Sequence, residues 1–250
     1  MEPGWWWLLP YDVSPTVLAV ALAAAAWYLR CAGAVTAGQR WCFWSGFACM
    51  YVALQTGLDY YAEHAFFMHR LQHVLLHHLG PFLLALGLPA EALDRWRAVR
   101  GWPRRLCHPW LTALLFNGLL LFWLLPAVHF PAMLDWRLYR LMNWSIALNG
   151  LLFWVAVLRA AAPGACPAAG QRIAMMLAVV PLQIAVGALI FLADRDLYPV
   201  YSLCGRVFGL DAIADQQLGG LLLWLPGVMV HMAGVLLVAG RLLRASPAPA

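Results

Sequence analysis

Five of the eight histidines in this 250-residue chain lie in one apolar stretch, 64–87. Three of them, His69, His73 and His77, are spaced i, i+4 and i+8, so on an α-helix successive rings lie only about 40° apart around the axis. Imidazole binds copper, zinc and haem iron, and two histidines one helical turn apart can chelate a single metal ion. His69 and His73 are therefore the sharpest candidate pair of metal ligands, and His77 extends the same stripe one turn deeper.

Further ligands for such a metal would have to come from other positions. Met68 offers a thioether sulfur, which favours Cu(I). His129, which we expect in a loop on the outer side of a membrane, and His231, on the last apolar segment, are the other candidate ligands. His78 lies off the stripe, where we expect it to face a neighbouring helix. For each of these histidines the alternative is a hydrogen-bonded packing residue.

Two further polar side chains belong to the same stretch. Gln72 lies on the histidine stripe, and Arg70 places a formal positive charge beside it. An ionisable residue inside a membrane segment marks a functional site by default. We expect Arg70 either to extend towards the membrane surface or to pair with Asp59, Glu63 or Asp215, because an unneutralised charge would repel a metal cation.

The composition is that of a membrane protein. Hydrophobic residues make up 64% of the chain and charged residues 11%, and the mean hydropathy is +0.74. A soluble domain does not have this composition. All 16 basic residues are arginine and the formal net charge is +5, but the arginines sort by membrane side and form no single patch. We therefore expect contact with membrane lipid and no nucleic-acid partner.

The apolar segments predict an all-α fold. In hydrocarbon the backbone must satisfy its own hydrogen bonds, and a helix of roughly 20 residues crosses the bilayer. We predict a polytopic helical bundle of about seven transmembrane helices, forming a single integral membrane domain over 1–250. The predicted spans are about 16–31, 41–58, 64–87, 108–126, 138–158, 173–193 and 215–243. An amphipathic surface helix is expected over 89–105.

The arginines predict the orientation of this bundle. The arginines predicted to lie on one side of the membrane are Arg30, Arg40, Arg95, Arg97, Arg100, Arg104, Arg105, Arg159, Arg172, Arg241 and Arg244. The other side receives Arg137, Arg140, Arg195 and Arg206. Because cytoplasmic loops are rich in basic residues, the N-terminus is predicted outside and the C-terminus in the cytoplasm.

A second polar constellation opens the seventh predicted span, with Asp215 and Gln216 followed by Gly219 and Gly220. Adjacent glycines let neighbouring helices approach closely. Asp215 is interpreted first as the N-cap of its own helix. The sequence has no P-loop, dinucleotide fingerprint, nucleophile elbow or His-Glu-x-x-His motif, so we do not expect an enzyme.

Both constellations resemble one family. The run His69-Arg70-Leu71-Gln72-His73, with Pro81 and Gly87-Leu88-Pro89 after it, resembles a third-helix pattern of the CtaG-like family of membrane cytochrome c oxidase assembly factors. The runs Leu197-Tyr198-Pro199, Asp215-Gln216-Gln217-Leu218-Gly219-Gly220 and Pro226-Gly227, with Trp224, are similar to the closing signature of that family. The chain departs from the pattern at Arg70, where Met is expected, and at Asn143, where His is expected.

The resemblance implies a multi-pass protein of the bacterial inner membrane that helps to assemble a haem-copper cytochrome c oxidase. Its implied partner is an oxidase subunit, and its implied metal is copper. The first hypothesis is a factor that binds copper on the outer side and passes it to that subunit. The alternatives are a metal-free membrane scaffold for oxidase assembly and a transmembrane haem-binding electron-transfer protein with His73 and His231 as axial ligands.

Overall fold

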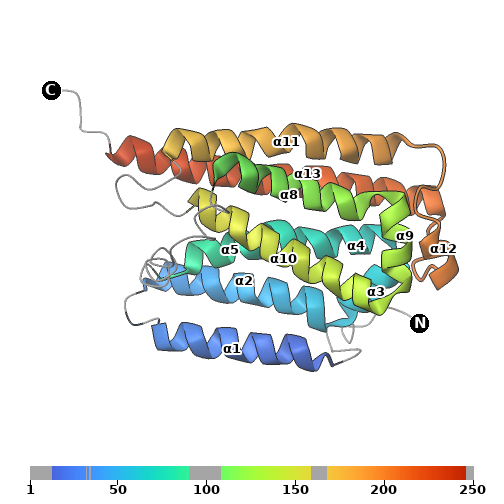
Figure 1. The fold of residues 1–250 in the computed structure, drawn as a ribbon, viewed down its shortest axis with the longest axis horizontal. Helices are drawn as coiled ribbons and strands as arrows, with labels where there is room; N and C mark the ends of the chain where they lie inside the picture. Colours follow the sequence, from blue (N-terminus) through green and yellow to red (C-terminus); the bar gives the residue numbers. More distant parts are fainter. Residues whose placement is uncertain (1–12, 32, 34, 90–107, 159–167, 246–250) are drawn as a thin grey trace.

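The computed structural model describes residues 13–31, 33, 35–89, 108–158 and 168–245. Every regular element in these ranges is a helix, which confirms the predicted all-α class, and the long helices run side by side as one bundle (Figure 1). The predicted surface helix over 89–105 lies outside the described ranges, except for its first residue.

Each predicted span corresponds to a helix or to a series of helices. The elements are α1 (Pro15–Cys31), α2 (Ala37–Gln55), α3 (Gly57–His64), α4 (Phe66–His73), the π-helix η3 (Val74–Leu79), α5 (Gly80–Gly87), α8 (Pro109–Leu124), α9 (Pro126–Leu134), α10 (Trp136–Leu158), α11 (Ala169–Leu192), α12 (Val200–Cys204) and α13 (Ala212–Ala245). We call the continuous series α4, η3 and α5 the central rod.

Three described helices, α10, α11 and α13, are long and apolar enough to cross a membrane. The pair α8 and α9 makes a fourth crossing if it counts as one span bent by 70°. The count is lower than the predicted seven partly because the third predicted span is divided into short helices that carry many polar side chains. Several long apolar helices nevertheless indicate a multi-pass membrane protein.

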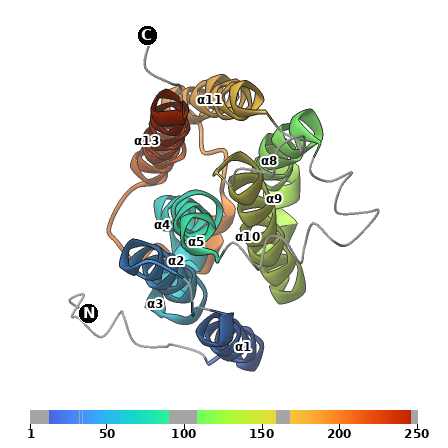
Figure 2. The ribbon, with the colours of Figure 1, turned by 90° about the vertical axis from the view of Figure 1, so that its left-hand side faces the viewer.

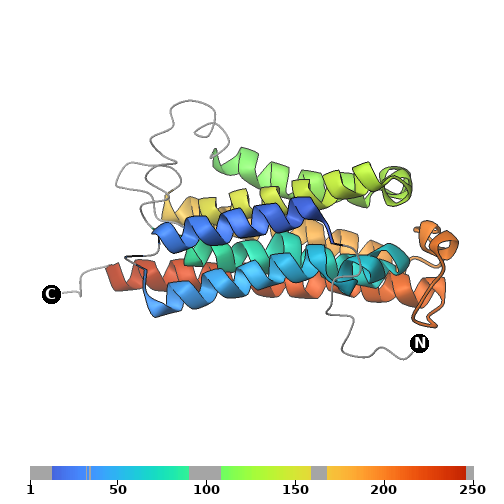
Figure 3. The ribbon, with the colours of Figure 1, turned by 90° about the horizontal axis from the view of Figure 1, so that it is seen from below.

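The central rod lies in the middle of the bundle. Viewed end-on, α2, α10 and α13 surround α4 and α5, and contacts join the rod to all three helices (Figure 2). Helix α1 lies on the outside, beside α2, and faces the viewer in Figure 3. The interior holds buried His, Asn and Gln side chains, whereas many leucines on the outer helix faces are exposed. This distribution suits a protein whose outer surface contacts lipid.

Two boundaries in the sequence prediction were wrong. The loop expected around His129 is helix α9, which begins at Pro126 after the non-helical residue Leu125 (φ −57°, ψ 124°). Proline favours the first turn of a helix because its fixed φ suits that turn and its missing N–H would be unpaired there anyway. The helix expected over 64–87 breaks at Ala65, whose extended backbone (φ −149°, ψ 133°) leaves His64 at the end of α3.

The π-helix η3 interrupts the histidine stripe. The Gly80 amide donates to the carbonyl of Leu75, five residues back, where an α-helix would bond four residues back. Pro81 has no N–H for the His77 carbonyl and would crowd it in an α-helix. That carbonyl instead accepts a hydrogen bond from Trp154 Nε1 at 3.2 Å. The wider turn breaks the predicted i, i+4, i+8 alignment after His73.

The adjacent glycines of α13 allow the close approach that the sequence predicted. A Cβ on Gly220 would lie 2.7 Å from the Gly187 carbonyl oxygen of α11, and one on Gly187 would lie 2.9 Å from the Gly220 carbonyl oxygen. A Cβ on Gly219 would overlap the Phe66 ring. These glycines bring α13 against both α11 and the start of the central rod.

Candidate functional site

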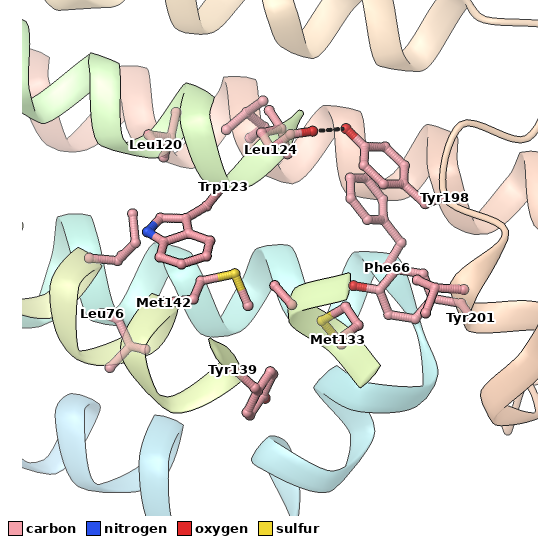
Figure 4. Close-up of a cluster of buried hydrophobic side chains, with 14 of the residues drawn as sticks. Phe66, Leu76, Leu120, Trp123, Leu124, Met133, Tyr139, Met142, Tyr198 and Tyr201 are labelled. Atoms are coloured by element: carbon pink, nitrogen blue, oxygen red, sulfur yellow. Dashed lines mark hydrogen bonds between the residues drawn. The ribbon is translucent and has the colours of Figure 1, made fainter. Parts of the chain in front are cut away.

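An apolar and aromatic cluster surrounds the first turns of α4. Phe66 stacks on Tyr198 with ring centroids 4.0 Å apart, and Tyr198 donates a hydrogen bond to the Leu124 carbonyl at 2.9 Å (Figure 4). Burial raises the pKa of Tyr198, in the loop after α11, to about 12, so this hydroxyl keeps its proton. The buried side chains of Met133 and Met142 belong to the same cluster.

Three histidine rings meet beside this cluster. His69 is fully buried, and its ring centroid lies 4.4 Å from that of His73 and 5.0 Å from that of His129. The i, i+4 spacing predicted the first contact. The second arises because the bend at Leu125 turns α9, with His129, across the end of the bundle.

His129 has both ring nitrogens engaged. Its Nδ1 lies 3.0 Å from the Trp123 carbonyl oxygen, and its Nε2 lies 2.8 Å from the Tyr201 hydroxyl. A carbonyl can only accept, so Nδ1–H donates to it and Nε2 accepts from Tyr201. This bonding makes His129 a packing residue in the described structure and leaves it no nitrogen free for a metal.

His69 and His73 keep free nitrogen lone pairs. Neither ring nitrogen of His69 has a hydrogen-bond partner among the described residues, although the Ala62 carbonyl lies near the ring. His73 Nε2 lies 3.3 Å from Asn143 Oδ1; because an amide oxygen accepts, Nε2 carries the proton and Nδ1 keeps its lone pair. In the described part of the chain, no group of three or more His, Cys, Asp or Glu residues could hold a metal ion.

The structure does not gather the other candidate ligands around this pair. His77 stacks on Phe116 with ring centroids 3.9 Å apart. His231 bonds through Nδ1 to the Gly227 carbonyl at 2.7 Å, and its ring is 5.4 Å from His78 in a separate group. Met68 packs, partly buried, against the apolar cluster.

Arg70 is buried, with 1% of its surface exposed. Its guanidinium carbon lies 5.2 Å from the centre of the Phe66 ring. None of its three guanidinium nitrogens has a hydrogen-bond partner in the ranges that the structure covers. Both expectations for Arg70 are therefore wrong: its side chain does not extend to the surface, and it does not pair with Asp59, Glu63 or Asp215. Asp59 and Asp215 are bonded to other groups.

Gln72 links the central rod to its neighbours. Its Nε2 donates to the Ala53 carbonyl at 2.8 Å and to Asp59 Oδ1 at 2.6 Å. The Tyr139 hydroxyl donates to the same carboxylate oxygen at 2.8 Å. This network ties α4 to α2, α3 and α10, so Gln72 positions the rod.

We expect Gln72→Leu to destabilise the protein by about 1–3 kcal/mol, because it leaves the buried Ala53 carbonyl and the partly buried Asp59 carboxylate short of a donor. Thermal unfolding of the detergent-solubilised protein measures this loss. The matched control is Gln217→Leu, a half-buried position on α13 outside the network. Equal losses of Tm in the two variants would contradict the role of the network.

Asp215 caps a helix other than its own. Its carboxylate accepts from the amides of Phe66 at 3.0 Å and Phe67 at 2.8 Å, at the start of α4, and it pairs with Arg206. The prediction of an N-cap for the seventh span was wrong because α13 begins earlier, at Ala212. Asp211 accepts from the Ala214 amide at 2.8 Å, at the start of α13.

Gln216 holds the loop that follows α11. Its Oε1 accepts from the Leu197 amide at 2.7 Å, and its Nε2 donates to the carbonyls of Ile190 and Arg195, each at 3.2 Å. This loop leads into Tyr198, which packs on Phe66. The second constellation therefore positions the aromatic residues beside the histidine group.

The sequence analysis missed Asn143 and Tyr201 as partners of His73 and His129. Asn143 was noted only as a departure from the family pattern, and its hydrogen bond to His73 places that departure in the site. His78, which lines the cavity beside His73, was expected only to face a neighbouring helix. Pro81, near the π-helix, is the local signal that could have predicted the change of register.

Comparison with known proteins identifies one family and two relatives, but no solved structure. The family model described as cytochrome c oxidase caa3 assembly factor (Caa3_CtaG) matches residues 20–245. Uncharacterized proteins of Mycobacterium bovis and Mycobacterium tuberculosis are each 27% identical over 242 residues, which covers 87% of this chain and 36% of each relative. The chain thus spans about a third of the length of these relatives. No solved structure matches the chain.

Proposed function

The chain belongs to the cytochrome c oxidase caa3 assembly factor (Caa3_CtaG) family, and we propose that it holds Cu(I) on His69 and His73 and passes it to an oxidase subunit. Copper is the cargo in this proposal, and the role is not enzymatic. The observation that carries it is the fully buried His69 ring, 4.4 Å from the ring of His73. Neither nitrogen of the His69 ring has a hydrogen-bond partner among the described residues, apart from the Ala62 carbonyl near the ring.

The donor set suits a transferable copper ion. Imidazole nitrogen is a good ligand for copper, and Cu(I) accepts low coordination numbers, so two histidines can hold it without a third ligand. A two-ligand site also leaves a coordination position through which the receiving subunit can take the metal. The edge-on contact with His129, at 5.0 Å between ring centroids, fixes the orientation of His69.

The proposed site lies near the end of the bundle that carries α9 and α12 (Figure 1). The opposite end carries the described arginines Arg30, Arg40, Arg172, Arg241 and Arg244. By the positive-inside rule, that end faces the cytoplasm, and the site lies near the outer face of a bacterial inner membrane. The start of α1 then lies at the outer face and the end of α13 at the cytoplasmic face.

We expect the purified full-length protein, loaded with copper under reducing conditions, to hold close to one Cu(I). The double variant His69→Ala, His73→Ala should lose at least about tenfold in affinity, since it removes both ligands. Elemental analysis and competition with a Cu(I) chelator measure both quantities. His108→Ala, at an exposed histidine, is the control and should bind as the wild type does.

A cell assay separates the copper role from the alternatives. In a strain that lacks its own factor, the double variant should fail to restore the oxidase, and added copper should partly rescue it. If the wild type binds no copper and the double variant still fails to restore the oxidase, the result would support the metal-free scaffold. The buried charge of Arg70 favours that alternative, because it repels a metal cation. The cavity beside His73, about 10 Å³, is far too small for a porphyrin and does not support the haem alternative.

A further inference from the structure

A small cavity lies where the central rod meets α8 and α13. Its volume is about 10 Å³, which is room for about one atom of the size of a water molecule. Its lining consists of Arg70, His73, Val74, His78, Leu120 and Leu223. The polar part of this lining comes from one cationic side chain and two imidazoles, and no carboxylate contributes to it.

The charge of Arg70 has no counterion in the described part of the chain. A guanidinium stays protonated in proteins, and an unpaired charge in a low-dielectric interior is strongly unfavourable. The carboxylate of Asp59 accepts from Gln72 and Tyr139, and that of Asp215 accepts from Arg206. The guanidinium nitrogens make no hydrogen bond within the described ranges. The compensating charge must then come from a group outside these residues.

We propose that this cavity binds a small monovalent anion of halide size, such as chloride, with Arg70 as its main ligand. A chloride ion is somewhat larger than a water molecule and requires the lining side chains to move slightly outward, whereas a carboxylate or phosphate group would require a much larger rearrangement. A water molecule would fit, but it would leave the charge uncompensated. His78 Nδ1 is buried and without a partner among the described residues, so it can supply a second donor.

The apolar side of the lining adds selectivity for an anion that sheds its hydration shell easily. Leu120 and Leu223 are 2% and 4% exposed, respectively, and keep bulk water from the guanidinium. The site goes beyond the proposed copper role and does not depend on it. If copper binds to His69 and His73, an anion on Arg70 also removes the repulsion between the guanidinium and the metal.

The first test measures thermal unfolding of the purified full-length protein in detergent, with sodium chloride replacing sodium gluconate at constant ionic strength. A ligand that binds only the folded state stabilises it by RT ln(1 + [L]/Kd), so Tm rises with the logarithm of the ligand concentration once that concentration exceeds Kd. We expect chloride and bromide to raise the Tm of the wild type by about 5 °C or more at concentrations about 100 times Kd. Arg70→Met should abolish the response, whereas Arg195→Gln, at an exposed arginine, should keep it.

The second test does not depend on the stability of the Arg70 variant. Val74→Ile adds one methyl group to the lining and keeps Arg70, so it should remove the chloride response by filling the cavity. Broadening of the chloride-35 NMR line by the wild type should be lost in the same variant. The proposal is overturned if chloride and gluconate give the same wild-type Tm, or if Val74→Ile broadens the chloride line as much as the wild type.

Discussion

Asp215→Ala is expected to destabilise the protein by about 3–5 kcal/mol, because it leaves two backbone amides without an acceptor and removes one partner of a partly buried ion pair. The carboxylate is almost fully buried, with 2% of the side chain exposed. Its loss leaves the amides of Phe66 and Phe67 without an acceptor and Arg206 without one of its carboxylate partners. Unfolding of the variant in mixed micelles at increasing denaturant measures the change.

Asp211→Ala is the matched control for this prediction. Asp211 caps its own helix through the Ala214 amide and is exposed, so its loss should cost only about 1 kcal/mol. A double-mutant cycle of Asp215→Ala with Arg206→Met separates the ion pair from the amide contacts. The capping role of Asp215 fails if its variant is no less stable than Asp211→Ala.

The loss of Asp215 should also disturb the arrangement of the His69 and His73 rings. His69 lies one turn after Phe66 on α4, and its own amide donates to the Ala65 carbonyl at the break before that helix. If the first turn of α4 frays, the 4.4 Å contact between the rings of His69 and His73 is no longer fixed. We therefore expect weaker copper binding by Asp215→Ala at temperatures where the variant is still folded.

Hydropathy and local spacing predicted part of this molecule well. The span expected over 16–31 is α1, Pro15–Cys31, and the span expected over 138–158 lies within α10, Trp136–Leu158. These signals are local, because the apolar run and the helix occupy the same residues. The contact between His69 and His73 was predictable for the same reason, since one helical turn brings their side chains together. The two short motifs also predicted the family, which the family model over residues 20–245 confirms.

The features that were not predicted depend on groups distant in sequence. Asp215 caps α4 across 149 residues of chain, and the usual rule for an N-cap considers only its own helix. His129 reaches His69 because of the bend between α8 and α9, which spacing within one helix cannot give. Arg70 was predicted to extend to the surface or to pair with Asp59, Glu63 or Asp215, yet it is buried, and Asp59 and Asp215 accept from other donors.

The register after His73 shows how the two kinds of information combine. Pro81 removes the donor that an α-helix would offer to the His77 carbonyl, and this is visible in the sequence. The hydrogen bond that this carbonyl accepts instead, from Trp154 of α10, cannot be predicted from the sequence. The structure thus places His78, and not His77, beside His73 in the lining of the cavity.

Gly150→Ala is expected to destabilise the protein by about 3 kcal/mol, at the upper end of the usual range for overpacking. A Cβ at this position of α10 would lie 2.6 Å from the His77 carbonyl oxygen and 2.9 Å from the His77 Cα. Both atoms belong to the backbone of η3, so no flexible side chain can move aside. The two helices must separate, and the hydrogen bond from Trp154 to His77 should weaken with them. Thermal unfolding in detergent measures the loss.

Gly118→Ala should change stability in the opposite direction. Gly118 lies in α8 with no atom within 4 Å of an added Cβ, and replacing an unhindered helical glycine by alanine stabilises by roughly 0.5–1 kcal/mol. The sign of the effect therefore separates close packing from helix propensity. Gly150→Ala should also weaken the chloride response, because displacement of His77 moves the adjacent His78 in the cavity wall. A stable Gly150→Ala protein would mean that α10 does not hold the π-helix in place, and Pro81 alone would then have to explain it.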